Sequence, residues 1–375
     1  MSIPSSSGLK TALAAIGLTL LSAAGANAQP SPNAPIAKAD GTVVLDGISV
    51  PISSLMSKEG GEYLRHLIVD QPFAGGPGPD DMKGVRAFQD KIMHGFLEPM
   101  RKRYNVNITE QRIGGVVTDV ITPAEGVAPE NRNRVLLNVH GGGFTTGARS
   151  ASLVESVPLA SIMRIKVISI DYRMGPEYKF PAASEDVAAV YREVLKTYDP
   201  SRIVLYGCSA GGMLTAESIA WFQAHNLPNP AAIGVFCASL GQMVVGDSAI
   251  LSAPLNGMRS FFPPPPPPSK DGKPTPAPTG PSYLSTAKPN DPLAFPLSSP
   301  ALLAKFPPTL FISGTRAFEF SAALDSHNAL TKAGVESQFH AWDGMVHGFF
   351  YNSETPESRD AYAIMAKFFE SHMAK

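Results

Sequence analysis

The sequence has 375 residues, with 44% hydrophobic and 17% charged side chains, which suits a globular protein with a sizeable core in one large domain or two small ones. A formal net charge of −1 gives no electrostatic reason to expect nucleic acid or an anionic membrane as a partner. The two cysteines, Cys208 and Cys237, are too few for a disulfide framework or a cysteine-rich metal site, and we expect two buried thiols rather than one disulfide.

The N-terminus has the pattern of an export signal. Lys10 precedes the apolar run "TALAAIGLTLLSAAG", and Ala26-Asn27-Ala28 then forms a small-x-small cleavage pattern. The run is shorter than the roughly 20 residues that a membrane-spanning helix needs, which disfavours an anchoring helix. We therefore expect residues 1–28 to be a signal peptide cleaved after Ala28, which implies a secreted or periplasmic protein. Residues 29–51 are expected to be a flexible mature N-terminus.

Residues 52–107 are predicted to form a helical cap. Two helical stretches, residues 53–70 and 82–104, are separated by "QPFAGGPGPDD", whose Gly and Pro residues indicate a loop.

From residue 108 to 375, short apolar strands alternate with amphipathic helices. The strand-like runs are "RVLLNV", "KVISIDY", "RIVLYG", "AIGVFCAS" and "TLFIS", and two of the helical stretches between them are "SEDVAAVYREVLKTY" and "GMLTAESIAWFQAHN". This alternation predicts an α/β fold with a mostly parallel central sheet and helices on both faces.

A proline-rich insertion at about residues 261–281 interrupts this pattern. Six consecutive prolines, residues 263–268, favour polyproline II because proline cannot donate a backbone hydrogen bond. We favour a solvent-exposed insertion; the alternatives are a docking peptide for a partner or the edge of a lid.

The segment "LYGCSAGG", Leu205–Gly212, contains Gly-x-Ser-x-Gly at Gly207, Ser209 and Gly211, between a strand and a helical run. In such an elbow the nucleophile is strained, and only small residues fit two positions to either side. The pattern predicts Ser209 as a nucleophile, with the Ala210 N–H at the positive end of the following helix.

A glycine run, "HGGGF", follows an earlier strand. The N–H groups of Gly141, Gly142 and Gly143, together with that of Ala210, could form an oxyanion hole. The alternatives are a phosphate-binding loop and a flexible turn. His140 could be a base or a metal ligand, but we expect it to brace the loop by hydrogen bonding.

A histidine in a glycine-flanked turn, His347 in "WDGMVHGFF", follows the strand-like "SQFHAW". It can serve as general base to Ser209. Its place after the serine and after "GTRAFEFS" matches the serine–acid–histidine order of α/β hydrolases.

Together these motifs resemble the hormone-sensitive lipase family of esterases over roughly residues 110–375. Further matching pieces are "DYRMGPEYKFPAA", "EDV", "NDPLAFPLSS" and "GMVHGFF". The resemblance implies hydrolysis of small or short-chain acyl esters without cofactor or metal, in a pocket shaped by the N-terminal helices. Two positions depart from the family: Cys208 stands where an acidic residue is usual, and Ala317 stands where the catalytic aspartate is usual.

Glu319 is the predicted replacement for the missing acid. It is two residues beyond Ala317, and in an extended segment its side chain would project from the same side. Asp325 is a weaker candidate within an expected helix, and Asp343 is close to His347 in sequence.

The sequence therefore predicts a serine carboxylesterase with Ser209, His347 and Glu319 as catalytic residues. Its partner would be a small-molecule ester, with no nucleic acid and no integral membrane segment in the mature chain. Because Ala317 breaks the family pattern, a catalytically impaired ligand-binding protein is the alternative of another class. An amidase or peptidase is a third reading.

Overall fold

The structure is a computed structural model that describes residues 36–45, 48–72, 76–78, 80–256 and 282–375. The expected signal peptide and the proline-rich insertion lie outside these residues.

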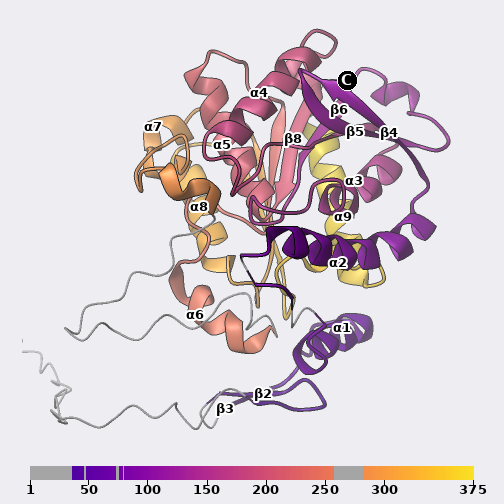
Figure 1. Cartoon of the computed structure of the whole chain (residues 1–375), viewed down its shortest axis with the longest axis vertical. Helices are drawn as coiled ribbons and strands as arrows, with labels where there is room; N and C mark the ends of the chain where they lie inside the picture. Colours follow the sequence, from indigo (N-terminus) through magenta and orange to yellow (C-terminus); the bar gives the residue numbers. More distant parts are fainter. Residues whose placement is uncertain (1–35, 46–47, 73–75, 79, 257–281) are drawn as a thin grey trace, which may run out of the picture. The chain divides into compact units, whose positions relative to one another are not determined.

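A sheet forms the centre of the fold (Figure 1). It has eight strands in the order β11-β10-β9-β8-β6-β7-β5-β4. The strands from β6 to β11 pair in parallel, whereas β5 pairs antiparallel with both β4 and β7. The predicted α/β class with a mostly parallel sheet is confirmed. The strands are β4 (Val106–Ile113), β5 (Val116–Pro123), β6 (Val135–Val139), β7 (Lys166–Ile170), β8 (Ile203–Cys208), β9 (Ala232–Phe236), β10 (Thr309–Gly314) and β11 (Ser337–Trp342).

The β4–β5 hairpin was not among the expected strands. Its two-residue turn is Gly114-Gly115, with φ of 59° and 84°. Glycine tolerates this left-handed backbone, which suits the twist of a tight hairpin.

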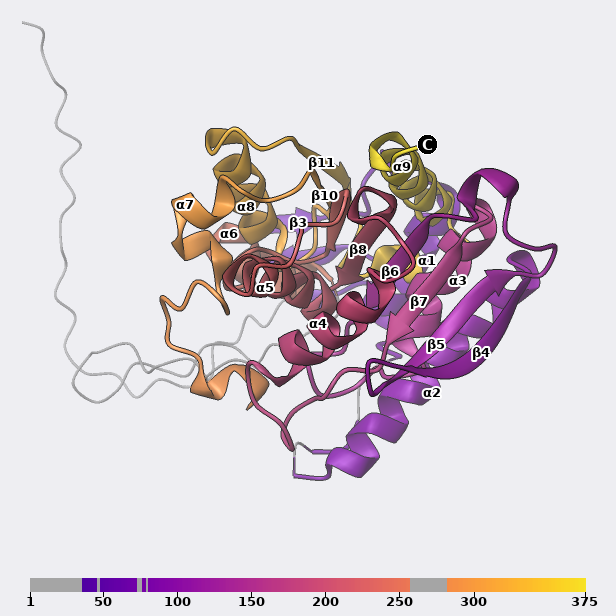
Figure 2. The ribbon, with the colours of Figure 1, turned by 90° about the horizontal axis from the view of Figure 1, so that it is seen from above.

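Helices cover both faces of the sheet (Figure 2). Alternate side chains of β6 point into two separate cores, because successive residues of a strand face opposite sides. Leu136 packs in one core with residues of α1, α2, α3 and α9, and Val135 and Leu137 pack in the other with residues of α4, α5 and α8. The helices are α1 (Lys58–Val69), α2 (Met82–Arg103), α3 (Ala151–Ile162), α4 (Ala182–Val194), α5 (Ala210–Ala224), α6 (Gly246–Leu255), α7 (Pro300–Leu303), α8 (Phe320–Lys332) and α9 (Pro356–His372). Short 3₁₀ turns are η1 (Pro129–Asn131), η2 (Pro200–Arg202), η3 (Ser282–Thr286), η4 (Pro296–Ser298) and η5 (Phe349–Tyr351).

The N-terminal region differs in part from the expectation. Within the supposedly flexible residues 29–51, the strands β1 (Ile36–Ala37), β2 (Val43–Leu45) and β3 (Ile48–Val50) form a small antiparallel sheet. The backbone pairing of β2 with β1 and with β3 gives this segment a regular structure that its local sequence does not predict. Two helices follow, α1 and α2, and β4 already begins at Val106. Helix α1 begins at Lys58 because the Ser57 hydroxyl caps it by accepting a hydrogen bond from the Gly60 N–H.

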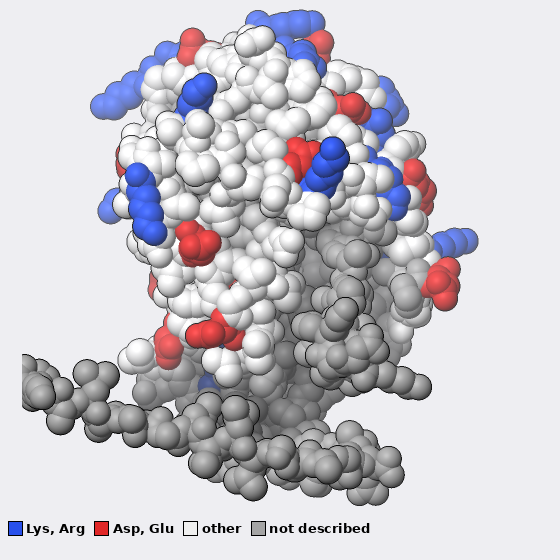
Figure 3. Space-filling model, turned by 90° about the vertical axis from the view of Figure 1, so that its left-hand side faces the viewer, with Lys and Arg blue, Asp and Glu red and all other residues white. Residues whose placement is uncertain are grey.

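The described residues show neither a single-sign charged patch on the face in Figure 3 nor a helix that could span a membrane. On the face shown in Figure 3, basic and acidic side chains are interspersed. Among the described residues, no helix combines the length and apolarity needed to cross a bilayer.

Candidate active site

Ser209 lies at a sharp turn between β8 and α5. Its backbone is left-handed, with φ 58° and ψ −126°, and its N–H donates to the Phe236 carbonyl at 2.8 Å. A non-glycine residue in this conformation is strained and is held there by its surroundings. The strain is the kind expected of a nucleophile elbow.

The glycines of the elbow are required by space. A Cβ at either Gly207 or Gly211 would collide with the Val139 carbonyl oxygen of β6. The elbow therefore packs directly on the end of the neighbouring strand. The same contact places the glycine loop after β6 beside Ser209.

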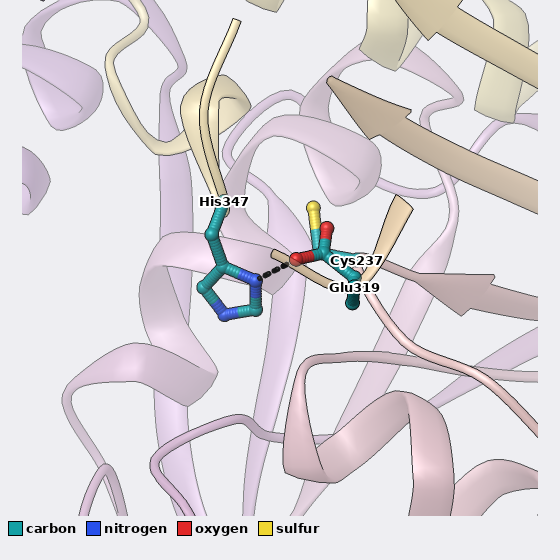
Figure 4. A group of neighbouring side chains, drawn as sticks. All are labelled: Cys237, Glu319 and His347. Atoms are coloured by element: carbon teal, nitrogen blue, oxygen red, sulfur yellow. Dashed lines mark hydrogen bonds and ion pairs between the residues drawn. The ribbon is translucent and has the colours of Figure 1, made fainter. Parts of the chain in front are cut away.

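His347 connects the serine to a carboxylate. Its Nε2 lies 3.0 Å from Ser209 Oγ, and its Nδ1 lies 2.9 Å from Glu319 Oε2. Figure 4 shows this second contact as a dashed line. The Glu319 side chain is fully buried, whereas that of His347 is 15% exposed. The structure thus brings Ser209, His347 and Glu319 together in one hydrogen-bonded chain, with both distances in the range for a nucleophile, a base and its orienting acid.

Glu319 reaches His347 by a different backbone route from the extended one expected. It is the N-cap of α8 with a helical backbone, φ −85° and ψ −2°. The Ala317 N–H donates to the Gly314 carbonyl at 3.0 Å, so the chain turns back before the helix starts. Ser313 Oγ donates to Glu319 Oε1 at 3.0 Å, which holds the second carboxylate oxygen.

The two other candidate acids lie elsewhere. Asp325 is exposed on α8. Asp343 accepts hydrogen bonds from Thr315 Oγ1 at 3.1 Å and from Ser53 Oγ. Asp343 therefore connects the loop that contains His347 to Thr315 and Ser53. The Ala317 side chain is fully buried.

Three of the four expected oxyanion donors have free N–H groups. The N–H groups of Gly142, Gly143 and Ala210 donate to no acceptor among the described residues. Gly142 and Gly143 have φ of 116° and 63°, a backbone that favours glycine. Gly141 departs from the expectation, because its N–H donates to Glu155 Oε1 at 2.9 Å and is not available to a substrate oxygen.

His140 is a buried support of the glycine loop. Its Nδ1 lies 2.7 Å from the Gly141 carbonyl oxygen, and its ring stacks on Tyr172 at 4.4 Å. Burial lowers its pKa to about 4, so the imidazole is neutral near pH 7. Because Nδ1 faces a carbonyl oxygen, which only accepts, the neutral ring has its proton on Nδ1 and donates from it, which matches the expected bracing role.

Several residues that contact the His347 loop or the glycine-loop support were not identified from the sequence as part of the site. Cys237 Sγ accepts the Gly348 N–H at 3.3 Å, and the Phe318 ring lies 4.6 Å from that of His347. Tyr351 Oη donates to Glu155 Oε1 at 2.7 Å. Their contacts are all long-range, so no local motif marks these residues. Both Cys208 and Cys237 are buried free thiols, as expected.

One set of side chains has the donor types of a metal site. Within the described part of the chain, ligand atoms of Cys237, Glu319 and His347 lie within 4.8 Å of one another (Figure 4). However, His347 Nδ1 and Glu319 are already joined to each other, and burial raises the pKa of the Cys237 thiol, which disfavours the thiolate that binds metals. The arrangement suits acyl transfer better than metal coordination.

Comparison with known proteins agrees with this geometry. A sequence profile described as alpha/beta hydrolase fold matches residues 136–351. An acetyl-hydrolase of Streptomyces hygroscopicus is 29% identical over 283 residues, covering 73% of this chain and 90% of the relative. An esterase of Acinetobacter venetianus is 25% identical, covering 70% and 82%.

Solved structures show the same fold. A variant of the esterase E40 has a TM-score of 0.70 and 25% identity, covering 85% of this chain and all (100%) of that chain. An esterase from the bacterial hormone-sensitive lipase family has a TM-score of 0.69 and 24% identity, covering 85% and 99%. The resemblance inferred from the motifs is confirmed.

Proposed function

Because this chain belongs to the α/β-hydrolase family, we propose that it is a serine carboxylic-ester hydrolase for small or short-chain acyl esters. The observation that carries the proposal is the chain of contacts from Ser209 Oγ to His347 Nε2, at 3.0 Å, and from His347 Nδ1 to Glu319, at 2.9 Å. A hydroxyl, an imidazole and a buried carboxylate in this order perform nucleophilic acyl transfer.

Acylation begins when Ser209 Oγ attacks the ester carbonyl carbon. His347 Nε2 takes the hydroxyl proton as the new C–O bond forms, and the carbonyl oxygen becomes an oxyanion. The N–H groups of Gly142, Gly143 and Ala210 stabilise that charge. The C–O bond to the alcohol then breaks, and His347 gives its proton to the departing alkoxide.

Deacylation repeats these steps with water. His347 takes a proton from water, whose oxygen attacks the acyl carbon. Collapse of the second tetrahedral intermediate returns the proton to Ser209 Oγ and releases the carboxylic acid. Throughout, Glu319 accepts a hydrogen bond from the Nδ1–H of His347, which fixes the tautomer and stabilises the imidazolium.

Relatives support the substrate class. The curated relatives include the acetyl-hydrolase and the esterase described above, and 30% identity over 236 residues links the chain to a carboxylesterase/phospholipase of Mycobacterium tuberculosis. The acetyl-hydrolase spans 73% of the chain, which favours a small acyl group.

The rival reading, a ligand-binding protein that has lost catalysis, rested on Ala317. The contact between Glu319 and His347 removes its main support. No specific contact of the described residues favours an amidase or peptidase.

The decisive experiment replaces the nucleophile. Ser209→Ala should lower turnover of p-nitrophenyl acetate by up to about 10⁶-fold and abolish labelling by a fluorophosphonate probe, because no acyl-enzyme can form. Ser218→Ala, a buried serine of the same helix, is the matched control and should retain activity. Ester turnover by Ser209→Ala near that of the wild type would refute the proposal. A wild type that neither takes the probe nor hydrolyses an ester would indicate the ligand-binding alternative.

We further propose export, with a mature chain that begins near Gln29. The support is the apolar run followed by Ala26-Asn27-Ala28. The intact mass of the protein purified from a periplasmic or culture fraction should equal that of a chain that begins at Gln29. An exported soluble protein that still carries Met1 would contradict this.

A further inference from the structure

One carboxylate outside the Ser209–His347–Glu319 chain meets three segments of the active site. Glu155, on α3, is 2% exposed. Its Oε1 accepts the Gly141 N–H at 2.9 Å and the Tyr351 phenol at 2.7 Å. Its Oε2 accepts Asn138 Nδ2 at 2.9 Å and the Cys208 N–H at 3.2 Å.

These partners come from the parts of the chain that supply the chemistry. Gly141 directly precedes the oxyanion donors Gly142 and Gly143. Cys208 directly precedes the nucleophile, and Tyr351 follows the base by four residues in η5. The segments also touch directly: a Cβ at Gly141 would lie 2.9 Å from the Cys208 carbonyl oxygen, 3.3 Å from Ser209 Cβ and 3.3 Å from Tyr351 Oη.

We propose that Glu155 is a positioning residue. It holds the glycine loop, the nucleophile elbow and the segment after His347 in the relative positions that catalysis requires. This inference rests on the proposed esterase function. Glu155 does not touch the substrate; it sets the separation between Ser209 Oγ and the N–H groups that receive the oxyanion. That separation matters most in the transition state, because the charge on the oxygen develops only there.

The bonding pattern suits an ionised carboxylate. Four donors point at its two oxygens, so each oxygen acts only as an acceptor. Burial raises the pKa of Glu155 to about 7, although the hydrogen bonds from Tyr351, Gly141, Asn138 and Cys208 each lower it. At pH 8 the carboxylate is mostly ionised, and all four bonds are available.

Glu155→Gln tests this role with almost no change of shape. The glutamine amide has one oxygen and one NH₂ group, so the NH₂ must face two donors on one side. Either Gly141 and Tyr351 or Asn138 and Cys208 then lose their acceptor. Misplacing a reacting group by about 1 Å can cost roughly 10²-fold in rate, and loss of one oxyanion donor costs about 10²- to 10³-fold in kcat.

The measurement separates positioning from folding. At pH 8, Glu155→Gln should lower kcat/KM for p-nitrophenyl acetate roughly 10²-fold through kcat, with KM within about threefold of the wild type. Inhibition by a short-chain alkyl trifluoromethyl ketone, which forms a tetrahedral oxyanion adduct with serine, should weaken by the same factor. Glu98→Gln, which removes an exposed helical carboxylate, should leave kcat, KM and the affinity for the ketone unchanged.

Three results would overturn the inference. They are unchanged kcat/KM in a folded Glu155→Gln, a change in KM alone, or a fall in kcat without a matching loss of ketone affinity. If Glu155→Gln fails to fold, Tyr351→Phe decides instead, because it removes one of the four donors and leaves the carboxylate in place. Parallel losses of about tenfold in kcat/KM and ketone affinity are expected, and unchanged values would reject the role.

The test also distinguishes its own failure from that of the proposed function. A wild type that shows Ser209-dependent hydrolysis while both variants match it removes only the role of Glu155. A wild type that neither hydrolyses esters nor binds the ketone removes the proposed function, and this inference with it.

Discussion

Glu319, the residue proposed to replace the aspartate usual in the family, is shifted along the chain and longer by one methylene. Ala317 is buried at the turn after β10, and Glu319 reaches His347 from the start of α8. Ser313 holds its second oxygen. A buried carboxylate without such partners would be costly, so these contacts explain how Glu319 remains at a site with no exposure. In this proposal the acid stands at another position of the chain and still contacts the imidazole of His347.

Glu319→Gln should lower turnover by roughly 10²- to 10⁴-fold with less effect on KM, because an amide facing Nδ1 favours the wrong tautomer. Steady-state kinetics with p-nitrophenyl acetate measure this. Asp325→Asn, an exposed change on the same helix, is the control and should keep full activity. Wild-type turnover in Glu319→Gln would mean that Ser209 and His347 act as a dyad.

At the scale of elements, helix α5 follows the proposed nucleophile and contains a buried carboxyl group without a hydrogen-bond partner among the described residues. It begins directly after Ser209 and carries Glu217 two turns further along. Glu217 is fully buried, and neither carboxylate oxygen has a hydrogen-bond partner among the described residues. Burial raises its pKa well above 4.5, so the folded protein favours the protonated form.

This protonation links stability to pH. The unfolded chain releases the proton near its ordinary pKa of 4.5, whereas the folded chain keeps it to higher pH. Stability from Glu217 is therefore fully present below about pH 4.5 and is lost as pH rises through the folded pKa. The loss is at most about 1.4 kcal/mol per pH unit. Glu155, whose pKa is raised to about 7, acts in the same direction.

Glu217→Gln should reduce the fall in thermal stability between pH 5 and pH 8 relative to the wild type, because the amide does not titrate. Tm measured at intervals across this range tests the slope. Glu98→Gln makes the same side-chain change at an exposed helical site and should leave the slope unchanged. A Glu217→Gln profile parallel to that of the wild type would show that Glu217 does not control it.

At the scale of the whole molecule, the sheet brings distant segments together. The strands β6, β8 and β10 are parallel to their neighbours, so the segments after them emerge at the same edge. Those segments are the glycine loop, the elbow and the turn that leads to Glu319. His347 joins them from the loop after β11, which also pairs in parallel with β10.

Local sequence was sufficient for features that depend on short-range chemistry. The alternation of strands and helices predicted the mostly parallel sheet, and Gly-x-Ser-x-Gly identified the strained turn at Ser209, because a Cβ at either flanking glycine would meet Val139. The order of serine, acid and histidine pointed to His347. Glu319 could be named because it is the only carboxylate in the short segment from Gly314 to Ser321.

Features that depend on long-range contact were decided only by the tertiary structure. The small sheet of β1, β2 and β3 forms within residues expected to be flexible, because strand pairing is not encoded in such short segments. The Gly141 N–H is removed from the expected oxyanion hole by Glu155, which lies 14 residues further along the chain. The same carboxylate meets Tyr351, 196 residues away. A sequence motif contains only residues that are close in the chain. The partner of a buried hydrogen-bonding group is determined by how the helices pack on the sheet.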